Sequence, residues 1–187
     1  MNLLTIAAAT AALAVSPHTK VLSVTNGSMA PTLHPGDHIL AGYDAFEPQL
    51  LDIVVFHPPL AAADDSLDDA CGDRSRHSDA MCAKAQPGLS RQLWLKRIVG
   101  LPGDRLKLRN GRLWRNGRTV DEPFITPCDG DCDFPRTIVV PRGRYMLMGD
   151  NRGLSYDSRD WGPVPKSALV ARADECDPQP AVGCPPR

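Results

Sequence analysis

Aromatic side chains are scarce in this chain: Phe, Trp and Tyr together make up 5% of its 187 residues. Lysine and arginine form no block, and the formal net charge is only -1. Proteins that bind nucleic acid usually gather positive charge and aromatic rings on one face, so no nucleic-acid partner is expected. The chain also lacks an apolar run of ~20 residues, the length that a helix needs to cross a bilayer.

Metal-binding cysteine spacings are absent as well. The chain has six cysteines, but none forms a Cys-x-x-Cys motif, and no histidine stands at zinc-finger spacing from them. We therefore expect no metal and no cofactor. Local disulfides in an oxidising compartment are the favoured interpretation, although other pairings and free thiols stay open. The local pairs are Cys71–Cys82, Cys128–Cys132 and Cys176–Cys184.

The N-terminal segment, residues 1–17, is almost wholly apolar but short. It lacks the basic start of a secretory signal, and the nearest cation, Lys20, follows it rather than precedes it. A membrane anchor, a targeting segment and a buried helix are all compatible with this pattern. We expect an anchor, mainly because of the motifs that follow.

Proline (18) and glycine (15) are plentiful and scattered, which favours short strands joined by turns over a helical bundle. The Asn-Gly pairs at Asn110 and Asn116 each predict a tight hairpin. Residues 167–172 fit either one short turn or a last strand. The sequence thus predicts a mostly β domain over residues 18–175, with strands near 21–24, 38–41, 52–56, 91–99, 105–108, 113–114, 137–140 and 145–148.

Two segments of this chain do not fit the strand pattern. Residues 61–90 hold many aspartates and few large apolar groups, which predicts a surface insertion without a core of its own. The aspartates lack the spacing of a calcium loop, so we interpret them as a solvated face. Residues 176–187 form a tail rich in proline and cysteine.

The candidate catalytic residues are a serine and a lysine. Ser28 stands in Asn26-Gly27-Ser28-Met29-Ala30-Pro31, and a serine hydroxyl needs a neighbouring base to act as a nucleophile. No Gly-x-Ser-x-Gly elbow exists, and no histidine sits in a turn typical of a triad partner. The histidines, most simply surface or loop residues, are His18, His34, His38, His57 and His77.

Lys96 has the apolar neighbours that a neutral lysine base requires. Trp94, Leu95, Ile98 and Val99 surround it in sequence, and strand alternation places Trp94, Lys96 and Ile98 on one face. Burial can lower the pKa of a lysine from ~10.4 by several units. Taken alone, the pattern fits a lysine that snorkels at a rim. Together with the serine motif, it favours a desolvated general base.

Three ordered motifs, with a middle strand, resemble those of the bacterial type I signal (leader) peptidases, which are membrane-bound serine–lysine endopeptidases. The first is Ser28-Met29-Ala30-Pro31-Thr32-Leu33, and the second runs from Lys96-Arg97-Ile98-Val99 to Gly103-Asp104. The third runs from Gly149-Asp150-Asn151-Arg152 to Arg159. The middle strand is Asp52-Ile53-Val54-Val55-Phe56, and the resemblance covers about residues 21–172 without the acidic insertion.

The resemblance implies a role for each matching residue. Ser28 would attack the substrate carbonyl, its backbone N–H would bind the oxyanion, and Lys96 would act as the general base. Ser155 would orient the Lys96 amine, while Asp157 and Arg159 would form a charge pair that braces the turn.

Met29 would help to build a substrate pocket, and the fold would consist of antiparallel sheets. The chain departs from the family at two positions. Asn26 stands where some members have a serine as second oxyanion donor; an amide can donate too. Leu51 stands where the family often has glycine.

The resemblance also implies a location and partners. The enzyme would sit in the bacterial inner membrane with its catalytic domain on the periplasmic side, in contact with lipid. Its substrates would be exported preproteins with small residues before the cut. Two alternatives stay open: a pilin-maturing conjugative-transfer peptidase of the same family, and a disulfide-rich secreted binding module without activity. A self-cleaving repressor-type peptidase is disfavoured, because no helix-turn-helix fits before Ser28.

Overall fold

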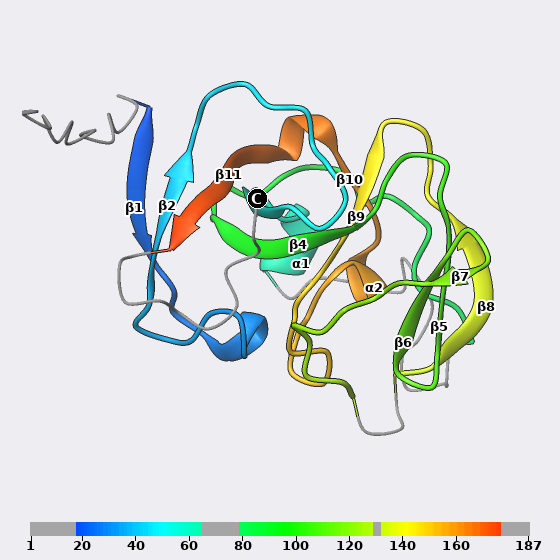
Figure 1. Ribbon diagram of the computed structural model, residues 1–187. Helices are drawn as coiled ribbons and strands as arrows, with labels where there is room; N and C mark the ends of the chain where they lie inside the picture. The colour runs from blue at the N-terminus through cyan, green and yellow to red at the C-terminus, as the bar shows by residue number, and fades with distance from the viewer. Residues whose placement is uncertain (1–17, 65–78, 129–131, 177–187) are drawn as a thin grey trace, which may run out of the picture.

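The chain forms two antiparallel sheets in the residues that the computed structural model describes, 18–64, 79–128 and 132–176 (Figure 1). The larger sheet has seven strands in the order β1-β2-β11-β3-β4-β9-β10. Their bounds are β1 Thr19–Ser23, β2 His38–Gly42, β3 Ile53–Phe56, β4 Trp94–Gly100, β9 Arg144–Met148, β10 Val164–Pro165 and β11 Leu169–Cys176. The mostly β, antiparallel fold expected from the sequence is confirmed.

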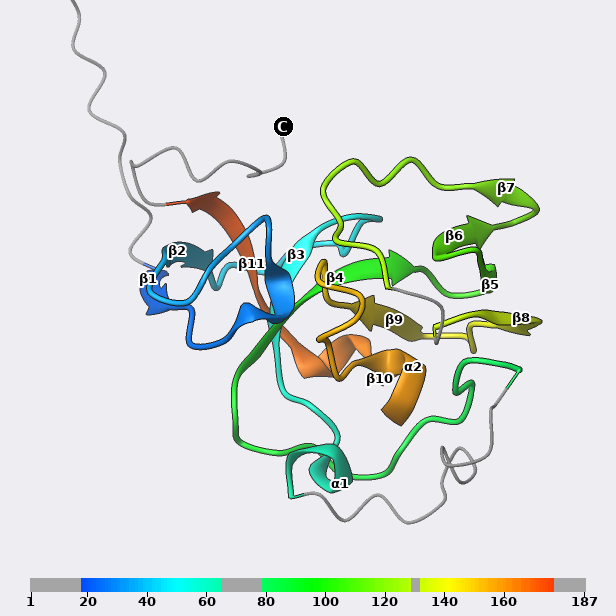
Figure 2. The same ribbon diagram turned by 90° about the horizontal axis from the view of Figure 1, so that it is seen from below.

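The smaller sheet has four strands in the order β7-β6-β5-β8. They are β5 Arg105–Arg109, β6 Arg112–Arg115, β7 Arg118–Thr119 and β8 Phe134–Val139. The two predicted Asn-Gly hairpins are confirmed: Asn110 and Gly111 have φ of 52° and 68°, and Asn116 and Gly117 have φ of 52° and 84°. These left-handed values match the twist of the flanking strands. Figure 2 shows this sheet and the pair β1–β2 at opposite ends of the molecule.

β3 is a continuous apolar run because it lies in the middle of the larger sheet with both of its faces covered. Val54 and Phe56 pack in a cluster on one face, with Trp161 of the short helix α2 (Ser158–Trp161). Ile53 and Val55 pack in a cluster on the other face, with Met29 of the 3-10 turn η1 (Gly27–Met29). Because both faces are covered, all four residues of β3 are buried.

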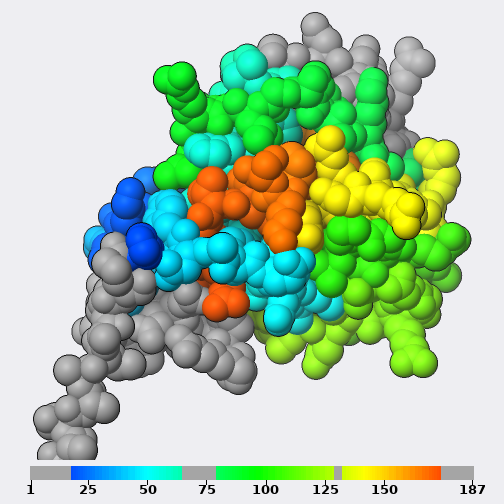
Figure 3. Space-filling model, turned by 90° about the horizontal axis from the view of Figure 1, so that it is seen from above, coloured from blue at the N-terminus to red at the C-terminus, as the bar shows by residue number. Residues whose placement is uncertain are grey.

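A third cluster joins the two sheets. Val99 of β4 and Met146 and Met148 of β9 pack against Leu106 and Leu108 of β5. Strands that are distant in sequence therefore share one core. The same mixing is visible on the surface, where orange residues of the C-terminal strands lie between cyan and yellow segments (Figure 3).

The predictions for the segments without clear strand character agree with the structure only in part. Residues 167–172 satisfy both alternatives, since the 3-10 turn η2 (Lys166–Ala168) leads directly into β11. A short helix, α1 (Leu60–Ala63), opens the acidic segment. The expectation that residues 61–90 lie on the surface is wrong for Met81 and Cys82, which are buried. Met81 packs in the cluster between the two sheets, so an apolar side chain here outweighs the acidic composition around it.

Several predictions concern residues outside the described ranges. These are the apolar segment 1–17, the central part of the acidic insertion, and the tail from 177 to 187. The Cys128–Cys132 disulfide is present. The pairings Cys71–Cys82 and Cys176–Cys184 each include a residue outside the described ranges. None of the helices described here has the length and apolar character required to span a bilayer.

Candidate active site

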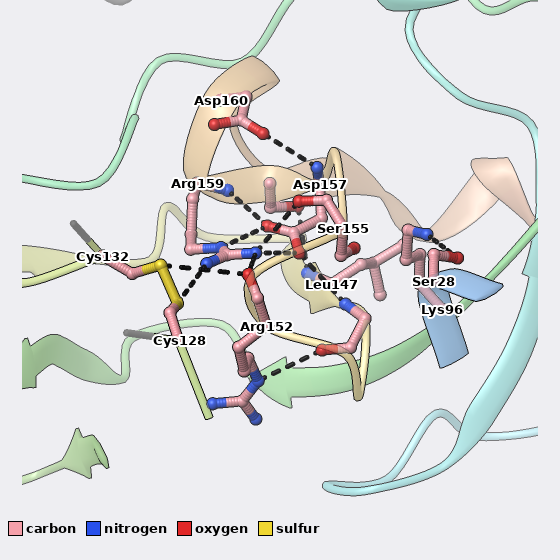
Figure 4. Close-up of polar contacts among 12 residues, drawn as sticks. Ser28, Lys96, Cys128, Cys132, Leu147, Arg152, Ser155, Asp157, Arg159 and Asp160 are labelled. Atoms are coloured by element: carbon pink, nitrogen blue, oxygen red, sulfur yellow. Dashed lines mark hydrogen bonds and ion pairs between the residues drawn. A yellow bond between two sulfur atoms is a disulfide. The ribbon is translucent and has the colours of Figure 1, made fainter. Parts of the chain in front are cut away.

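The hydroxyl of Ser28 and the amine of Lys96 meet although 68 positions separate them in sequence. Ser28 lies in η1, the turn that follows β1, and Lys96 lies in β4, next to the central strand β3 of the larger sheet. Lys96 Nζ is 2.7 Å from Ser28 Oγ, which is hydrogen-bond distance (Figure 4). The expected contact between the two groups is therefore present, and a neutral amine there could accept the serine proton.

Lys96 is buried, with 5% of its surface exposed, so it does not snorkel at a rim. Burial lowers the pKa of its amine from 10.5 to about 8, because the charged form loses its hydration. Asp157 opposes this shift, and Arg159 acts in the same direction as burial. At neutral pH an appreciable fraction of Lys96 is therefore uncharged and able to act as a base.

A cavity of about 630 Å³ opens beside the two reactive groups. Its lining comes from two stretches of chain: residues 22–26, which continue β1 toward Ser28, and residues 92–96, which lead into β4 and include Lys96. Met29 also lines this cavity, as do Ile39 and Val55 from the cluster beneath. The cavity offers an extended peptide a channel with both polar and apolar walls that passes beside Ser28.

Asn26 caps η1 in a way that the sequence reasoning did not foresee. Its Oδ1 accepts the backbone N–H of Ser28 at 3.1 Å. This N–H is the donor expected to bind the oxyanion of a tetrahedral intermediate. Asn26 thus accepts the hydrogen bond of the Ser28 N–H when no substrate is bound. Its side chain must move away before this N–H can bind an oxyanion.

Asp157 and Arg159 form a buried pair rather than a surface one, with 0% and 6% exposed. Arg159 Nε and Nη2 each donate to the Asp157 carboxylate at 2.8 Å, and Nη2 also donates to the carbonyl oxygens of Arg152 and Ser155. Burial would raise the pKa of Asp157, but the guanidinium outweighs it and holds that pKa below its usual value. The expected bracing of the turn is present, and it places a charge pair beside Lys96.

Ser155 lies in the site but makes none of the expected contacts. Its Oγ is buried and has no hydrogen-bond partner among the described residues, so the expected bond to the Lys96 amine is not formed. A Cβ at Gly149 would collide with both Ser155 Oγ and the Ser28 carbonyl. Ser155 and the carbonyl of Ser28 therefore both pack against Gly149. The segments that carry Ser28 and Ser155 can approach this closely only because Gly149 has no side chain.

A buried cluster that sequence reasoning missed joins the three motifs. Arg97 donates through Nε and Nη2 to Asp150 at 2.8 and 2.6 Å, and Thr32 Oγ1 donates to the same carboxylate. Arg97 also donates to the carbonyl of Leu51, which adopts a φ of 71° in the left-handed region that glycine favours. The signal available in the sequence was that Thr32, Arg97 and Asp150 each stand inside a motif.

A third buried ion pair, Arg152–Glu122, fixes the same turn. Arg152 donates through Nη1 and Nη2 to Glu122, and its Nε donates to the carbonyl of Gly149 at 3.1 Å. Arg152 and Glu122 side chains are 0% and 3% exposed. Glu122 stands outside all three motifs, in the connection between β7 and β8, and nothing in its sequence surroundings marked it.

The chain is also similar in sequence to known proteins. A family model described as signal peptidase, peptidase S26, matches residues 1–176. This chain belongs to the signal peptidase family. Probable signal peptidase I-2 of Synechocystis sp. is 32% identical over 153 residues, which cover 80% of this chain and 59% of that protein. Signal peptidase I of Bacillus caldolyticus is 31% identical over 166 residues, covering 81% and 75%.

Two further proteins are similar to this chain. The chain is 30% identical to signal peptidase I of Leptolyngbya laminosa and spans 64% of its length, so it covers about three-fifths of such relatives. A solved signal peptidase I from Enterococcus faecalis aligns with a TM-score of 0.44 at 22% identity, over 69% of this chain and 98% of that one.

Proposed function

We propose that this protein is a membrane-associated serine endopeptidase that removes signal peptides from exported preproteins by means of a Ser28–Lys96 dyad. The observation that carries the proposal is the 2.7 Å approach of a buried lysine amine with a lowered pKa to a serine hydroxyl beside a peptide-sized cavity. Membership of the signal peptidase family supports the substrate class.

In this proposal Ser28 Oγ attacks the carbonyl carbon of the scissile bond while neutral Lys96 takes the hydroxyl proton. The substrate carbonyl oxygen becomes an oxyanion, which displaces Asn26 Oδ1 and accepts the Ser28 N–H. The Lys96 ammonium then returns its proton to the leaving amine, and an acyl-enzyme forms. In the second half, Lys96 takes a proton from water as the water oxygen attacks the acyl carbon; the ester bond to Ser28 Oγ breaks, Ser28 Oγ takes the proton back, and the signal peptide leaves with a free carboxyl end.

The supporting residues act on the position and charge of the dyad. Asp157 and Arg159 bracket the turn beside Lys96, and Gly149 allows that turn to reach the serine loop. Ser155 is available to contact the Lys96 amine after a rotation of its hydroxyl-bearing side chain, since no other group holds its Oγ among the described residues. Met29 lines the cavity that would receive the small residues before the cut.

The remaining parts of the proposal concern the setting. The bacterial relatives described above are named signal peptidases. Exported preproteins emerge on the outer side of the plasma membrane, where the catalytic domain would lie next to lipid. A disulfide between Cys128 and Cys132 fits an oxidising compartment of this kind. No cofactor or metal takes part in the proposed reaction.

The test is cleavage of a preprotein with an Ala-x-Ala site by the full chain in detergent micelles, with products resolved by mass. Ser28→Ala and Lys96→Ala should each lower the rate by ~1000-fold or more, because they remove the nucleophile or its base. Ser167→Ala and Lys84→Ala, which change the same residue types at exposed positions outside the cavity lining, should cleave normally.

The product masses also separate the alternatives. A free carboxyl end on the signal peptide marks hydrolysis, whereas a joined or circular product marks the pilin-maturing relative. Cleavage by both dyad variants at the rate of the unaltered protein contradicts the dyad. Absence of cleavage by the unaltered protein on every such preprotein favours a binding module instead.

A further inference from the structure

Residues 122–128, here called the strap, cross the turn that carries Asp157 and Arg159. The strap belongs to the connection between β7 and β8. It begins at Glu122, which pairs with Arg152, and continues past Phe124, whose ring centroid lies 4.0 Å from the Arg97 guanidinium. At Thr126 it forms a parallel bridge with Asn151. The strap thus contacts Arg97, which follows Lys96 in the second motif, and also Asn151 and Arg152 of the third motif.

The strap ends in the Cys128–Cys132 disulfide, and this disulfide lies against Arg159. Arg159 Nη1 points at Cys128 Sγ at 3.7 Å, and Cys132 Sγ lies 3.9 Å from the carbonyl oxygen of Arg152. Figure 4 shows the Arg159 guanidinium between the disulfide and Asp157. One edge of the guanidinium therefore faces sulfur, while its Nε and Nη2 bind the carboxylate.

Arg159 matters to Lys96 because the two charges of the pair act on the amine in opposite directions. Asp157 stabilises the ammonium form and Arg159 destabilises it; Asp150 and Asp160 add smaller effects in the direction of Asp157. A guanidinium that leaves the carboxylate exposes Lys96 to an uncompensated negative charge. The amine is then protonated up to a higher pH and is a poorer base at neutral pH.

We propose that the Cys128–Cys132 disulfide is a positioning element for the Ser28–Lys96 pair, because it holds Arg159 on Asp157 and so keeps that carboxylate neutralised. The inference rests on the proposed function and extends it to two residues outside the motifs. Neither cysteine lines the cavity, so we expect the disulfide to act on proton transfer and not on substrate binding.

The experiment compares pH profiles of cleavage for the full-length unaltered chain and the Cys128→Ser/Cys132→Ser variant. We expect the acid limb of the variant to move up by about one pH unit, with kcat at pH 7 lowered roughly tenfold, since an unpaired carboxylate shifts a neighbouring base by this order. KM should stay within about twofold, and the rate should recover at alkaline pH.

Glu122→Gln is the matched control, because it weakens the strap at its other end and leaves the disulfide intact. It should lower the melting temperature without moving the acid limb. An unchanged limb in the double-serine variant overturns the proposal. An equal shift in both variants also overturns it, because general loosening of the strap would then explain the effect.

A direct measurement separates this inference from the proposed function. The ¹³Cε signal of Lys96, identified by its loss in Lys96→Arg, can be titrated by NMR without any substrate. We expect its midpoint to rise in the double-serine variant, and an unmoved midpoint contradicts the inference whether or not the protein cleaves preproteins. If that variant fails to fold, brief treatment of the folded protein with a phosphine reductant gives the same dithiol state, since both cysteines are partly exposed; mass mapping of the new thiols identifies which bond was reduced.

Discussion

The pH dependence of cleavage follows from the buried position of Lys96. Its pKa of about 8 makes the neutral fraction rise roughly fiftyfold between pH 6 and pH 8, but only about twofold between pH 8 and pH 10. A lysine that kept its pKa of 10.5 would still gain roughly seventy-fivefold between pH 8 and pH 10. Because only the neutral amine accepts the Ser28 proton, kcat/KM should follow the first pattern and reach a plateau above pH 9.

The assay is an initial-rate series on a peptide with an Ala-x-Ala site and no group that titrates between pH 6 and pH 10. Circular dichroism at each pH confirms that the protein stays folded. Lys96→Arg provides the control, since arginine keeps the positive charge at every pH of the series and cannot act as the base. It should be inactive throughout.

Two results would refute this reasoning. A rate that climbs steeply from pH 8 to pH 10 would show that burial does not lower the pKa of Lys96. A limb near pH 8 that persists in Lys96→Arg would show that another group is the base.

Two other changes test the packing around the dyad. Gly149→Ala places a methyl group against the Ser28 carbonyl and should cost roughly a hundredfold in kcat, as expected for a displacement of about 1 Å, whereas Gly153→Ala meets no atom closer than 3.9 Å and should stay active in the cleavage assay; equal rates would contradict this. Asp150→Asn breaks a fully buried ion pair and should lower the free energy of unfolding in urea by about 3 kcal/mol. Asp79→Asn breaks an exposed pair and should change that free energy by less than about 1 kcal/mol, so similar losses in the two variants would argue against the buried pair as a structural anchor.

Local pattern was sufficient for most of the secondary structure. The β-branched run at Ile53 predicted a strand, which the structure confirms, and the Asn-Gly pairs predicted hairpins that the backbone angles at Asn110 and Asn116 confirm. Such features depend on neighbours in sequence, where periodicity and turn chemistry act directly. Composition was a poorer guide at Met81, where one apolar side chain reached the core from an acidic segment.

The three motifs could be recognised in the sequence, but the contacts between residues of different motifs could not. Strand alternation placed Lys96 on an apolar face, and the serine motif supplied Ser28 as a candidate. Neither observation measures the distance between the two groups, because they are 68 positions apart and β2 and β3 lie between them in sequence. The same holds for Thr32 and Asp150, which are 118 positions apart and share one hydrogen bond.

The sequence by itself therefore determined most of the strands, the two Asn-Gly hairpins and the three motifs with their reactive residue types, because each depends on a short stretch of chain. Only the tertiary structure decided which groups touch. It brought Lys96 to Ser28, put the side-chain oxygen of Asn26 on the serine N–H, left Ser155 Oγ without a hydrogen-bond partner among the described residues, and laid a disulfide against Arg159. These contacts arise from the packing of distant strands around shared cores, and no local periodicity encodes which side chain a buried polar group will meet.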